Sequence, residues 1–492
     1  MDTSLSPISD DRFGPAEARH LLVRTAFAPD RHRARALVGL GVQGAVAWVL
    51  AGGDDSGLPG PPGGPDIRRP FTEEERRAYR QALGSDDPAL RERARASRQQ
   101  IDRDDRQMHK DLQTWWLGRM IKTASPMREF QTLLWHGHFA TAYQPVQDAW
   151  LLYQQNEMFR RYGLESFATL ARGIVRDPAM IKYLNNHQNR KGEPNENLAR
   201  ELMELFTLGE GQYREGDIRE GARALTGFTY DDNAFSFNQT RHDDGKKSIL
   251  GRTGRFDGDD FVEILLRHPA CARYIALKLY RHYVADVSDR FGDLSAAQKS
   301  VVDQIAKRLR ADKYALGPTL GVLLSSRHFY DAEVVGRKIK SPAQLVVGTA
   351  RSLGTPERST SRLHENMRMM GQSLFDPPSV AGWGVGRSWI NTSTLFARQN
   401  TCVYMITGKN PGRRWDRGAT NYDPMSLVAD LDAAKPAEVS RVLMNDLLGA
   451  HVAEDRRAPL EAFLNEGGGP VTGDRLMGFL TLVTAMPEYQ LC

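Results

Sequence analysis

The densest group of chemically active side chains lies in residues 194–209, PNENLARELMELFTLG. Helical spacing brings its charged and amide side chains within an arc of roughly 140°: Glu196, Asn197, Arg200, Glu201 and Glu204. Arg200 can pair with a carboxylate one turn away on either side, and Asn195 can accept hydrogen bonds from first-turn amides. Such a face is typical of a solvated amphipathic helix. It would equally suit carboxylates held in a cleft for acid–base hydrolysis.

Two histidines follow one another closely in the segment WHGHF at 135–139. In an extended segment His136 and His138 would point the same way, as metal ligands often do. In a helix they would point about 200° apart, and only one could serve a site. Gly137 favours a helix end here, so both geometries stay open, as does a purely capping or core role for the pair.

Another histidine, His242, lies in the segment HDDGK at 242–246. The Asp-Gly pair predicts a tight turn, and a plain hairpin tip is one interpretation. The other is that the hairpin places His242 and Asp243 over the acidic helix. There the imidazole would act as general acid or base, with the neighbouring carboxylate fixing its tautomer.

A second hypothesis is that the same groups bind a divalent metal ion. Glu201 and Glu204 are one turn apart, and inward-facing carboxylates of this kind bind metal in helical bundles. His136 and His138 would complete the ligand set. The Glu-x-x-His motif typical of such sites is absent, so the pattern favours this hypothesis only weakly.

The segment PPSVAGWGVGRSWINT at 377–392 combines proline, glycine and two tryptophans. Trp383 and Trp389 with Asn391 would form an aromatic wall with a polar edge. Sugar rings favour such a wall because their apolar faces stack on it while their hydroxyls bond the edge. The competing interpretation is that the tryptophans only anchor a long loop on the core.

The elements that must position these residues are helical nearly everywhere. We expect helices over 16–26, 126–136, 146–162, 164–176, 195–208, 215–226, 259–284, 296–325, 336–353 and 392–406, with two short ones up to about residue 51, four short ones in 424–484 and a long charged segment over 72–123. Residues 52–71 predict an exposed Gly/Pro loop, and 228–251 a hairpin insertion in which Phe235–Phe237 pairs with 248–250. The sequence therefore predicts a mainly α fold, with residues 1–492 forming one large helical domain.

Composition excludes several classes of protein. The net charge of +5 comes from 66 basic and 61 acidic residues that are interleaved, so no nucleic-acid-binding stripe is present. Three cysteines in 492 residues predict no disulfide framework. No run approaches the ~20 apolar residues of a membrane span, and no secretory signal is visible. We expect a cytoplasmic protein as the sequence stands, or a periplasmic or secreted one if a signal was removed.

Several ordered motifs carry a resemblance over essentially the whole chain. They are HLLVRTAF at 20–27, LLWHGHFAT at 133–141, YLNN at 183–186, PNENLARELMELFTLGEGQY at 194–213, ARALTGFTYD at 222–231, HDDGKKSILG at 242–251, LFDPPSVAGWGVGRSWINT at 374–392 and MPEYQ at 486–490. The chain resembles the domain of unknown function 1800 family. Ala28 departs from the glycine usual there. Relatives are often encoded beside a sulfatase-like family, domain of unknown function 1501, which implies a shared pathway or complex.

Three functional hypotheses follow. The first is an enzyme whose carboxylate/histidine site acts hydrolytically on a glycan or other polyhydroxylated substrate, with Arg200 orienting a carboxylate and the tryptophans shaping the cleft. The second is a divalent-metal enzyme that uses the same cluster. The third is a non-enzymatic helical scaffold that binds the sulfatase-like protein, with the acidic helix fixing the fold through buried ion pairs.

Overall fold

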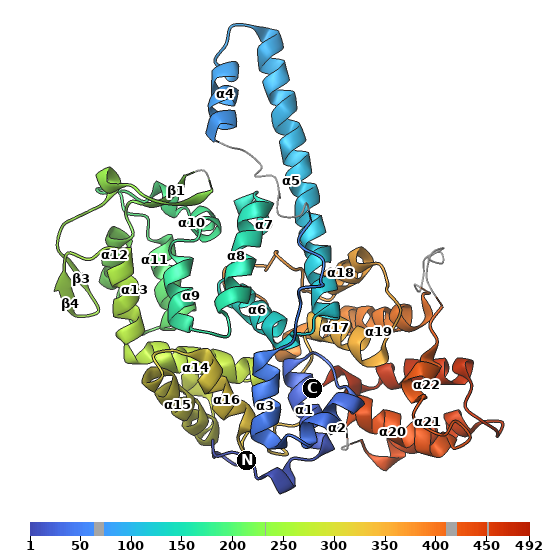
Figure 1. Cartoon of the computed structure of the whole chain (residues 1–492). Helices are drawn as coiled ribbons and strands as arrows, with labels where there is room; N and C mark the ends of the chain where they lie inside the picture. Colours follow the sequence, from blue (N-terminus) through green and yellow to red (C-terminus); the bar gives the residue numbers. More distant parts are fainter. Residues whose placement is uncertain (63–72, 232, 410–420, 450–451) are drawn as a thin grey trace.

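The computed structural model describes residues 1–62, 73–231, 233–409, 421–449 and 452–492, and the mainly α prediction is confirmed. These residues contain 22 α-helices and two small antiparallel sheets of two strands each (Figure 1). A single hydrophobic cluster runs through them from Ile8 to Tyr489. Among the described helices, none combines the length and the apolar composition that crossing a membrane requires.

The base of the molecule in Figure 1 is built from helices of two separate parts of the chain. They are α1 (Pro15–Thr25), α2 (Arg31–Val38), α3 (Gly41–Ala51), α14 (Pro269–Tyr283), α15 (Ala296–Ala311) and α16 (Leu316–Ser325). Helix α14 packs against α15, and α3 packs against α16.

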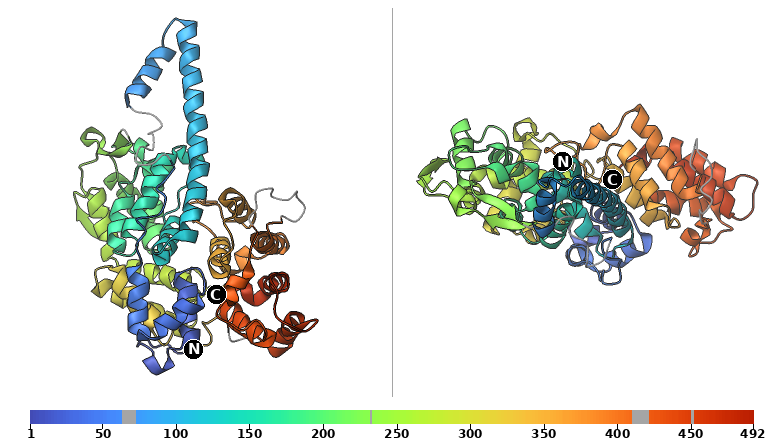
Figure 2. Two further views of the ribbon diagram at one scale, coloured as in Figure 1. Left: turned by 45° about the vertical axis from the view of Figure 1, so that its right-hand side comes forward. Right: turned by 90° about the horizontal axis from the view of Figure 1, so that it is seen from above.

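Two lobes and an arm rise from this base, and the view from above in Figure 2 shows the lobes on either side of the arm. The arm consists of α4 (Glu73–Leu83) and α5 (Pro88–Lys122). The first lobe contains α6 (Pro126–His138), α7 (Tyr143–Val146), α8 (Ala149–Tyr162), α9 (Phe167–Ile174), α10 (Pro178–Tyr183), α11 (Asn197–Glu201), α12 (Glu215–Ala224) and α13 (Gly258–Arg267). The second contains α17 (Pro342–Leu353), α18 (Thr360–Met369), α19 (Thr392–Thr407), α20 (Pro436–Leu448), α21 (Glu454–Asn465) and α22 (Gly473–Ala485).

Two of the predicted long helices are each two helices in the structure. The segment 259–284 breaks at His268, which adopts an extended conformation before Pro269 begins α14. The proline cannot continue the hydrogen bonding of α13, and it disfavours helical geometry in the residue before it. The segment 296–325 breaks where Lys313 and Tyr314 take positive φ angles.

The predicted β insertion is confirmed, but its predicted pairing as a single hairpin is wrong. Strand β1 (Phe228–Asp231) pairs with β2 (Ala234–Phe237), and β3 (Lys247–Ile249) pairs with β4 (Arg252–Gly254). There are thus two hairpins, and Asp244-Gly245 lies between them instead of forming a hairpin turn. Phenylalanines on the same face favour the first pairing, because the rings of Phe228 and Phe237 meet at 5.6 Å.

The predicted Gly/Pro loop over 52–71 is described only as far as residue 62, and 63–71 lie outside the described residues. Residues 52–62 form turns without helix or strand and are mostly exposed.

A buried carboxylate joins three of the helices that hold the site. Glu129 on α6 is 0% exposed and accepts hydrogen bonds from Trp116 Nε1 (2.8 Å) and Arg119 Nε (2.7 Å) on α5. It also accepts from Arg160 on α8, at 2.7 Å from Nε. Burial raises the pKa of Glu129, but the two arginines more than offset this and hold it below its ordinary value. The carboxylate is therefore charged and fully compensated.

We expect Glu129→Gln to lower the free energy of unfolding by about 3–5 kcal/mol, because it removes the buried charge that Arg119 and Arg160 share, and the remaining pairs of these arginines with Asp55 and Glu157 do not replace its hydrogen bonds. Urea unfolding at pH 7 measures this. The matched control is Glu263→Gln, whose carboxylate pairs with Arg172 at the surface and should cost about 1 kcal/mol or less. Equal losses in the two variants would contradict a special role for the buried carboxylate.

Candidate functional site

A cleft of about 360 Å³ lies between α6, α14 and the loop that carries both tryptophans of the 377–392 segment. We call it the tryptophan cleft and define it by six of its lining residues: His138, Lys278, His282, Asp289, Trp383 and Trp389. The structure thus places His138 from one predicted motif and both tryptophans from another around one cavity.

Close backbone packing sets the tryptophan loop against the end of α6. Gly382 has φ +83°, and a Cβ atom there would lie 2.0 Å from the carbonyl oxygen of Gly137. A Cβ atom on Gly137 would in turn lie 3.2 Å from the ring of Trp383. Only glycine at both positions allows this approach. The glycine between the two histidines therefore serves the contact with Trp383.

His138 is buried, and its protonation state is fixed by the backbone. Its Nε2 donates to the carbonyl oxygen of Phe206 at 3.0 Å, which leaves Nδ1 as an acceptor. Burial, together with the positive charge of Lys278, lowers the pKa of His138 to about 3, and the hydrogen bond to Phe206 opposes this shift. The imidazole is therefore neutral near pH 7.

His282 on α14 faces the same cleft in a similar state. Burial lowers its pKa to about 3, with Lys338 adding to the shift and a backbone hydrogen bond to Phe130 opposing it. Within the described chain, His282 Nε2 is buried without a hydrogen-bond partner, as are His138 Nδ1 and Trp383 Nε1. Buried polar atoms are nearly always paired, so three unpaired atoms at one cleft need an explanation.

Positive charge enters the cleft from α14. Lys278 and His282 are four residues apart, with Arg281 between them, so one face of α14 carries all three. Burial, together with the positive charge of Arg281, lowers the pKa of Lys278 to about 8, and the negative charge of Asp289 opposes this shift. Lys278 Nζ also lies over the ring of Tyr274, 4.9 Å from its centroid.

His136 points away from His138, as the helical alternative requires. It is 0% exposed, and aromatic rings surround it: Trp116 at 5.2 Å, Phe375 at 5.1 Å and Trp383 at 5.5 Å. Burial lowers its pKa to about 3, and Arg160 contributes in the same direction. His136 belongs to the aromatic core behind the tryptophan loop.

The acidic segment is shorter as an α-helix than predicted. Helix α11 covers Asn197–Glu201, and a π-helix follows over Leu202–Thr207. The π-helix turns carbonyl groups toward the cleft side, where Tyr274 Oη donates to Leu205 O at 2.8 Å and His138 to Phe206 O. π-Helical turns are frequent at functional sites. This one forms the layer between the acidic side chains and the tryptophan cleft.

The carboxylates of this segment lie on the far side of that layer. Glu204 accepts from Tyr213 Oη at 2.7 Å, and burial raises the pKa of the half-buried Glu201, with Glu204 raising it further. Neither glutamate lines the tryptophan cleft. The structure therefore does not assemble the predicted site from Glu201, Glu204 and His138, because the π-helix separates them.

The other residues of the acidic face form a surface network. Arg200 binds Glu215 at 2.9 Å and Glu196 at 3.1 Å, and its side chain is 36% exposed. The predicted buried ion pair at Arg200 is thus wrong, because both partners are open to solvent. Asn197 is exposed. Asn195 does accept a first-turn amide, with its Oδ1 3.0 Å from Asn197 N.

His242 and Asp243 stabilise the connection between the two hairpins and do not cover the acidic helix. His242 Nδ1 lies 2.8 Å from Thr226 O. Asp243 accepts from Arg223 Nε on α12 at 2.8 Å. Arg223 lowers the pKa of Asp243 to about 2 against the effect of burial, and the Gly245 amide assists. These contacts give His242 and Asp243 a structural role.

Asn391 is also structural. Its side chain caps α19 by accepting from Thr394 N at 2.9 Å, which turns the amide away from a role beside the tryptophans. Trp389 is 5% exposed and lines the cleft, as predicted for an aromatic wall.

The predicted metal ligands do not converge. Across the described ranges, no three His, Cys, Asp or Glu side chains are close enough together to hold a metal ion. His136 faces the aromatic core, His138 faces the cleft, and Glu201 and Glu204 lie beyond the π-helix. The four residues therefore do not form the proposed ligand set.

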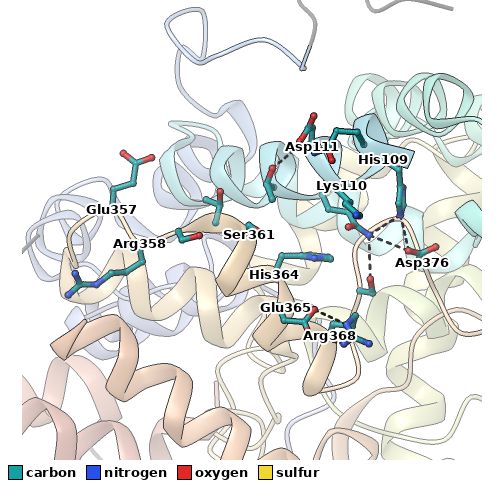
Figure 3. Close-up of a pocket in the computed structure, with 16 residues that line it drawn as sticks. His109, Lys110, Asp111, Glu357, Arg358, Ser361, His364, Glu365, Arg368 and Asp376 are labelled. Carbon is teal, nitrogen blue, oxygen red and sulfur yellow. Dashed lines mark hydrogen bonds and ion pairs between the residues drawn. The ribbon is translucent and has the colours of Figure 1, made fainter. Parts of the chain in front are cut away.

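A second, larger cavity of about 1060 Å³ lies at the root of the arm, between α5 and α18 (Figure 3). Every residue lining it is polar, so it offers no stacking surface for a ring. Its buried groups largely satisfy one another: His109 Nε2 lies 2.9 Å from Asp376, and Gln113 donates to Leu374 O at 2.9 Å. The tryptophan cleft is the stronger candidate because its buried polar atoms lack partners.

Sequence reasoning missed the contribution of α14. Lys278, Arg281 and His282 occur together in ALKLYRHY, which reads as an apolar helix with polar interruptions. Their spacing of three and four residues was the available signal, since it puts them on one face. Asp289 follows in a loop with no distinguishing pattern.

The comparisons with known proteins agree with the motifs. The family model described as "Protein of unknown function (DUF1800)" matches residues 20–491. No curated protein and no solved structure matches the chain significantly.

We expect Gly382→Ala to displace the tryptophan loop, because the new methyl group would collide with the Gly137 carbonyl and the residue would need a positive φ. The cost should be about 2 kcal/mol or more, measured as a fall in the unfolding free energy and a change in tryptophan fluorescence. Gly292→Ala is the control, since no atom lies within 4 Å of its added Cβ. An unchanged fluorescence spectrum in the Gly382 variant would contradict the packing described here.

Proposed function

The chain belongs to the DUF1800 family, whose description assigns no activity, and we propose that it is an enzyme that acts hydrolytically on a glycan or another polyhydroxylated substrate. The proposed site is the tryptophan cleft. The groups that act there differ from those expected from the acidic helix.

One observation carries this proposal: three side chains that line one cleft each have a buried polar atom without a hydrogen-bond partner. His138 Nδ1 and His282 Nε2 are unpaired, and Trp383 Nε1 is an unpaired donor. Leaving such an atom unpaired costs about 1–3 kcal/mol. A sugar hydroxyl both donates and accepts hydrogen bonds, so a polyhydroxylated ligand would satisfy acceptors and donor together.

The aromatic wall supports the same class of ligand. Trp383 and Trp389 line the cleft along with polar side chains such as Ser341 and Gln344. A sugar ring presents apolar C–H faces and polar edges, so it suits a cavity in which tryptophans and hydrogen-bonding groups alternate.

The cleft also supplies groups for proton transfer. Glycosidases that use two carboxylates need a second one across the bond, and Asp289 is the carboxylate that lines this cleft. We therefore assign both proton transfers to Asp289: it accepts the proton of the attacking water and returns it to the oxygen of the leaving group as the glycosidic bond breaks. Neutral His138 and His282 would orient that water and the substrate hydroxyls. The site remains a carboxylate/histidine site, with Asp289 in place of Glu201 and Glu204.

The test is turnover on a panel of oligosaccharides, measured as new reducing ends. Asp289→Asn should lower kcat by about 10²-fold or more, the usual range for a lost acid–base group, and His138→Ala should lower it too, because the attacking water loses a group that orients it. Glu201→Gln and Glu204→Gln are matched controls outside the cleft and should keep at least half the activity. Loss in the controls with full activity in Asp289→Asn would refute the assignment. Circular dichroism of each variant separates unfolding from lost chemistry.

The projecting arm favours a second function, binding of a partner protein. Helix α5 spans 35 residues, and its first half is largely exposed beyond the body of the molecule (Figure 1). A stable helix that packs against little of its own chain is a common protein-binding element. We propose that the arm contacts the sulfatase-like protein that the family resemblance implies.

Leu90 is 42% exposed near the start of α5, and it should be part of such an interface. We expect Leu90→Asp to weaken co-purification with the sulfatase-like partner at least fivefold, because a carboxylate would be placed in an apolar contact. Leu482→Asp, at a leucine of similar exposure on α22, is the control. Equal recovery of the partner with both variants would exclude the arm.

A further inference from the structure

We propose that the substrate in the tryptophan cleft carries a negatively charged oxygen group, a carboxylate or a sulfate ester, and that Lys278 binds it. This inference rests on the proposed function and specifies its substrate as an acidic glycan. It depends on the placement of the cationic side chains of the cleft and on which of them already have partners.

Lys278 is the cation of the cleft that lacks a counter-ion. Lys338 pairs with Asp286. Arg281 donates to Val287 O at 3.0 Å, and its Nη1 lies 3.9 Å from Asp289. Over the described part of the chain, no carboxylate lies within ion-pair distance of Lys278 Nζ, and its contact is with the ring of Tyr274. The ammonium group therefore has a free coordination direction at the wall of a cavity.

A lysine in this position is costly for the empty protein. Removal from water disfavours the charged form of Lys278, and the nearby guanidinium of Arg281 disfavours it further. Lys278 is half-buried and has no ion-pair partner among the described residues, so a purely structural role would be met equally well by an apolar side chain. An incoming anion would supply the missing pair and recover that cost.

The position of Lys278 also fits an acidic sugar. It lines the same cavity as Trp383, on which a ring would stack, and it lies close enough to His138 to lower the histidine's pKa. The carboxylate of Asp289 is 64% exposed, so solvent screens its repulsion of a bound anion. An anionic substituent at Lys278 and hydroxyls at the two histidines can thus belong to one residue of a glycan.

Calorimetric titration with matched oligosaccharides of equal length tests the inference. The probes are a neutral galactose oligomer, a galacturonate oligomer and a sulfated galactose oligomer. Wild-type protein should bind at least one acidic oligomer tenfold or more tightly than the neutral one. Lys278→Met should reduce this preference to twofold or less, because it removes the cation and keeps most of the side-chain volume, and Lys278→Arg should keep part of it. The tighter acidic probe identifies carboxylate or sulfate.

A pH series gives a second readout. The groups that face Lys278 are Tyr274 and Arg281 on its own helix, His138 on α6, Asp289 on the next loop and Lys338 across the cleft. His138, with a pKa of about 3, and Tyr274, with a raised pKa, do not titrate between pH 7 and pH 9. With a Lys278 pKa of about 8, the affinity for the acidic oligomer should fall about tenfold over this interval. It should stay flat in Lys278→Met.

The outcomes separate the two proposals. If wild-type protein binds neutral and acidic oligomers equally, or if Lys278→Met keeps the preference, the role of Lys278 is refuted and the glycan function stands. If no oligomer of either kind binds, the proposed function falls and this inference falls with it. Lys278→Met should fold at least as stably as wild type, since the half-buried lysine makes no ion pair in the described chain, and thermal unfolding checks this.

Discussion

The candidate site depends on the buried ion cluster of Glu129. Helix α6 carries this carboxylate in its first turns and His138 at its end. The contacts of Glu129 with Arg119, Arg160 and Trp116 fix α6 against α5 and α8 at a point where water is absent. Charged hydrogen bonds are directional, so they set the rotation of α6 about its axis. That rotation sends His138 toward the cleft and His136 into the aromatic core.

A second constraint is a close contact between two backbone segments. It places the tryptophan loop beside the end of α6, and the cavity lies between them. A Cβ atom on Gly382 would lie 2.0 Å from the carbonyl oxygen of Gly137, and one on Gly137 would lie 3.2 Å from the Trp383 ring. Gly386 is similarly restricted, because a Cβ atom there would lie 2.9 Å from Asp286, the partner of Lys338. The tryptophan loop is thus held at both ends of its turn. A rigid wall of this kind lets Trp383 keep an unpaired N–H at the cavity without collapsing onto it.

Much of the fold was accessible to sequence reasoning, and the failures have physical causes. Apolar periodicity located most helices, but His268 with Pro269 and the positive φ angles at Lys313 and Tyr314 divided two of them. The opposed directions of His136 and His138 correspond to the helical alternative for 135–139, which the sequence left open beside the extended one, as it left open whether the tryptophans form a wall or only anchor the loop. The separation of Glu201 from His138 could not be predicted from the sequence. It results from the π-helix at Leu202–Thr207, whose bonding is completed by Tyr274, a residue 69 positions from its Leu205 partner.

The location of the site follows from where the protein leaves polar groups unsatisfied. On the acidic helix, each charge that the sequence emphasises has found a partner, as Arg200 has with Glu196 and Glu215, or solvent. In the tryptophan cleft the lining side chains include two neutral imidazoles and an indole that each have a buried polar atom without a partner, and the half-buried ammonium group of Lys278, which makes no ion pair in the described chain. Such atoms carry a free-energy cost that a bound ligand would remove. A cluster of charged residues in the sequence indicates the side of a helix that faces solvent. Polar atoms that are buried at a cleft without hydrogen-bond partners indicate where a ligand is expected.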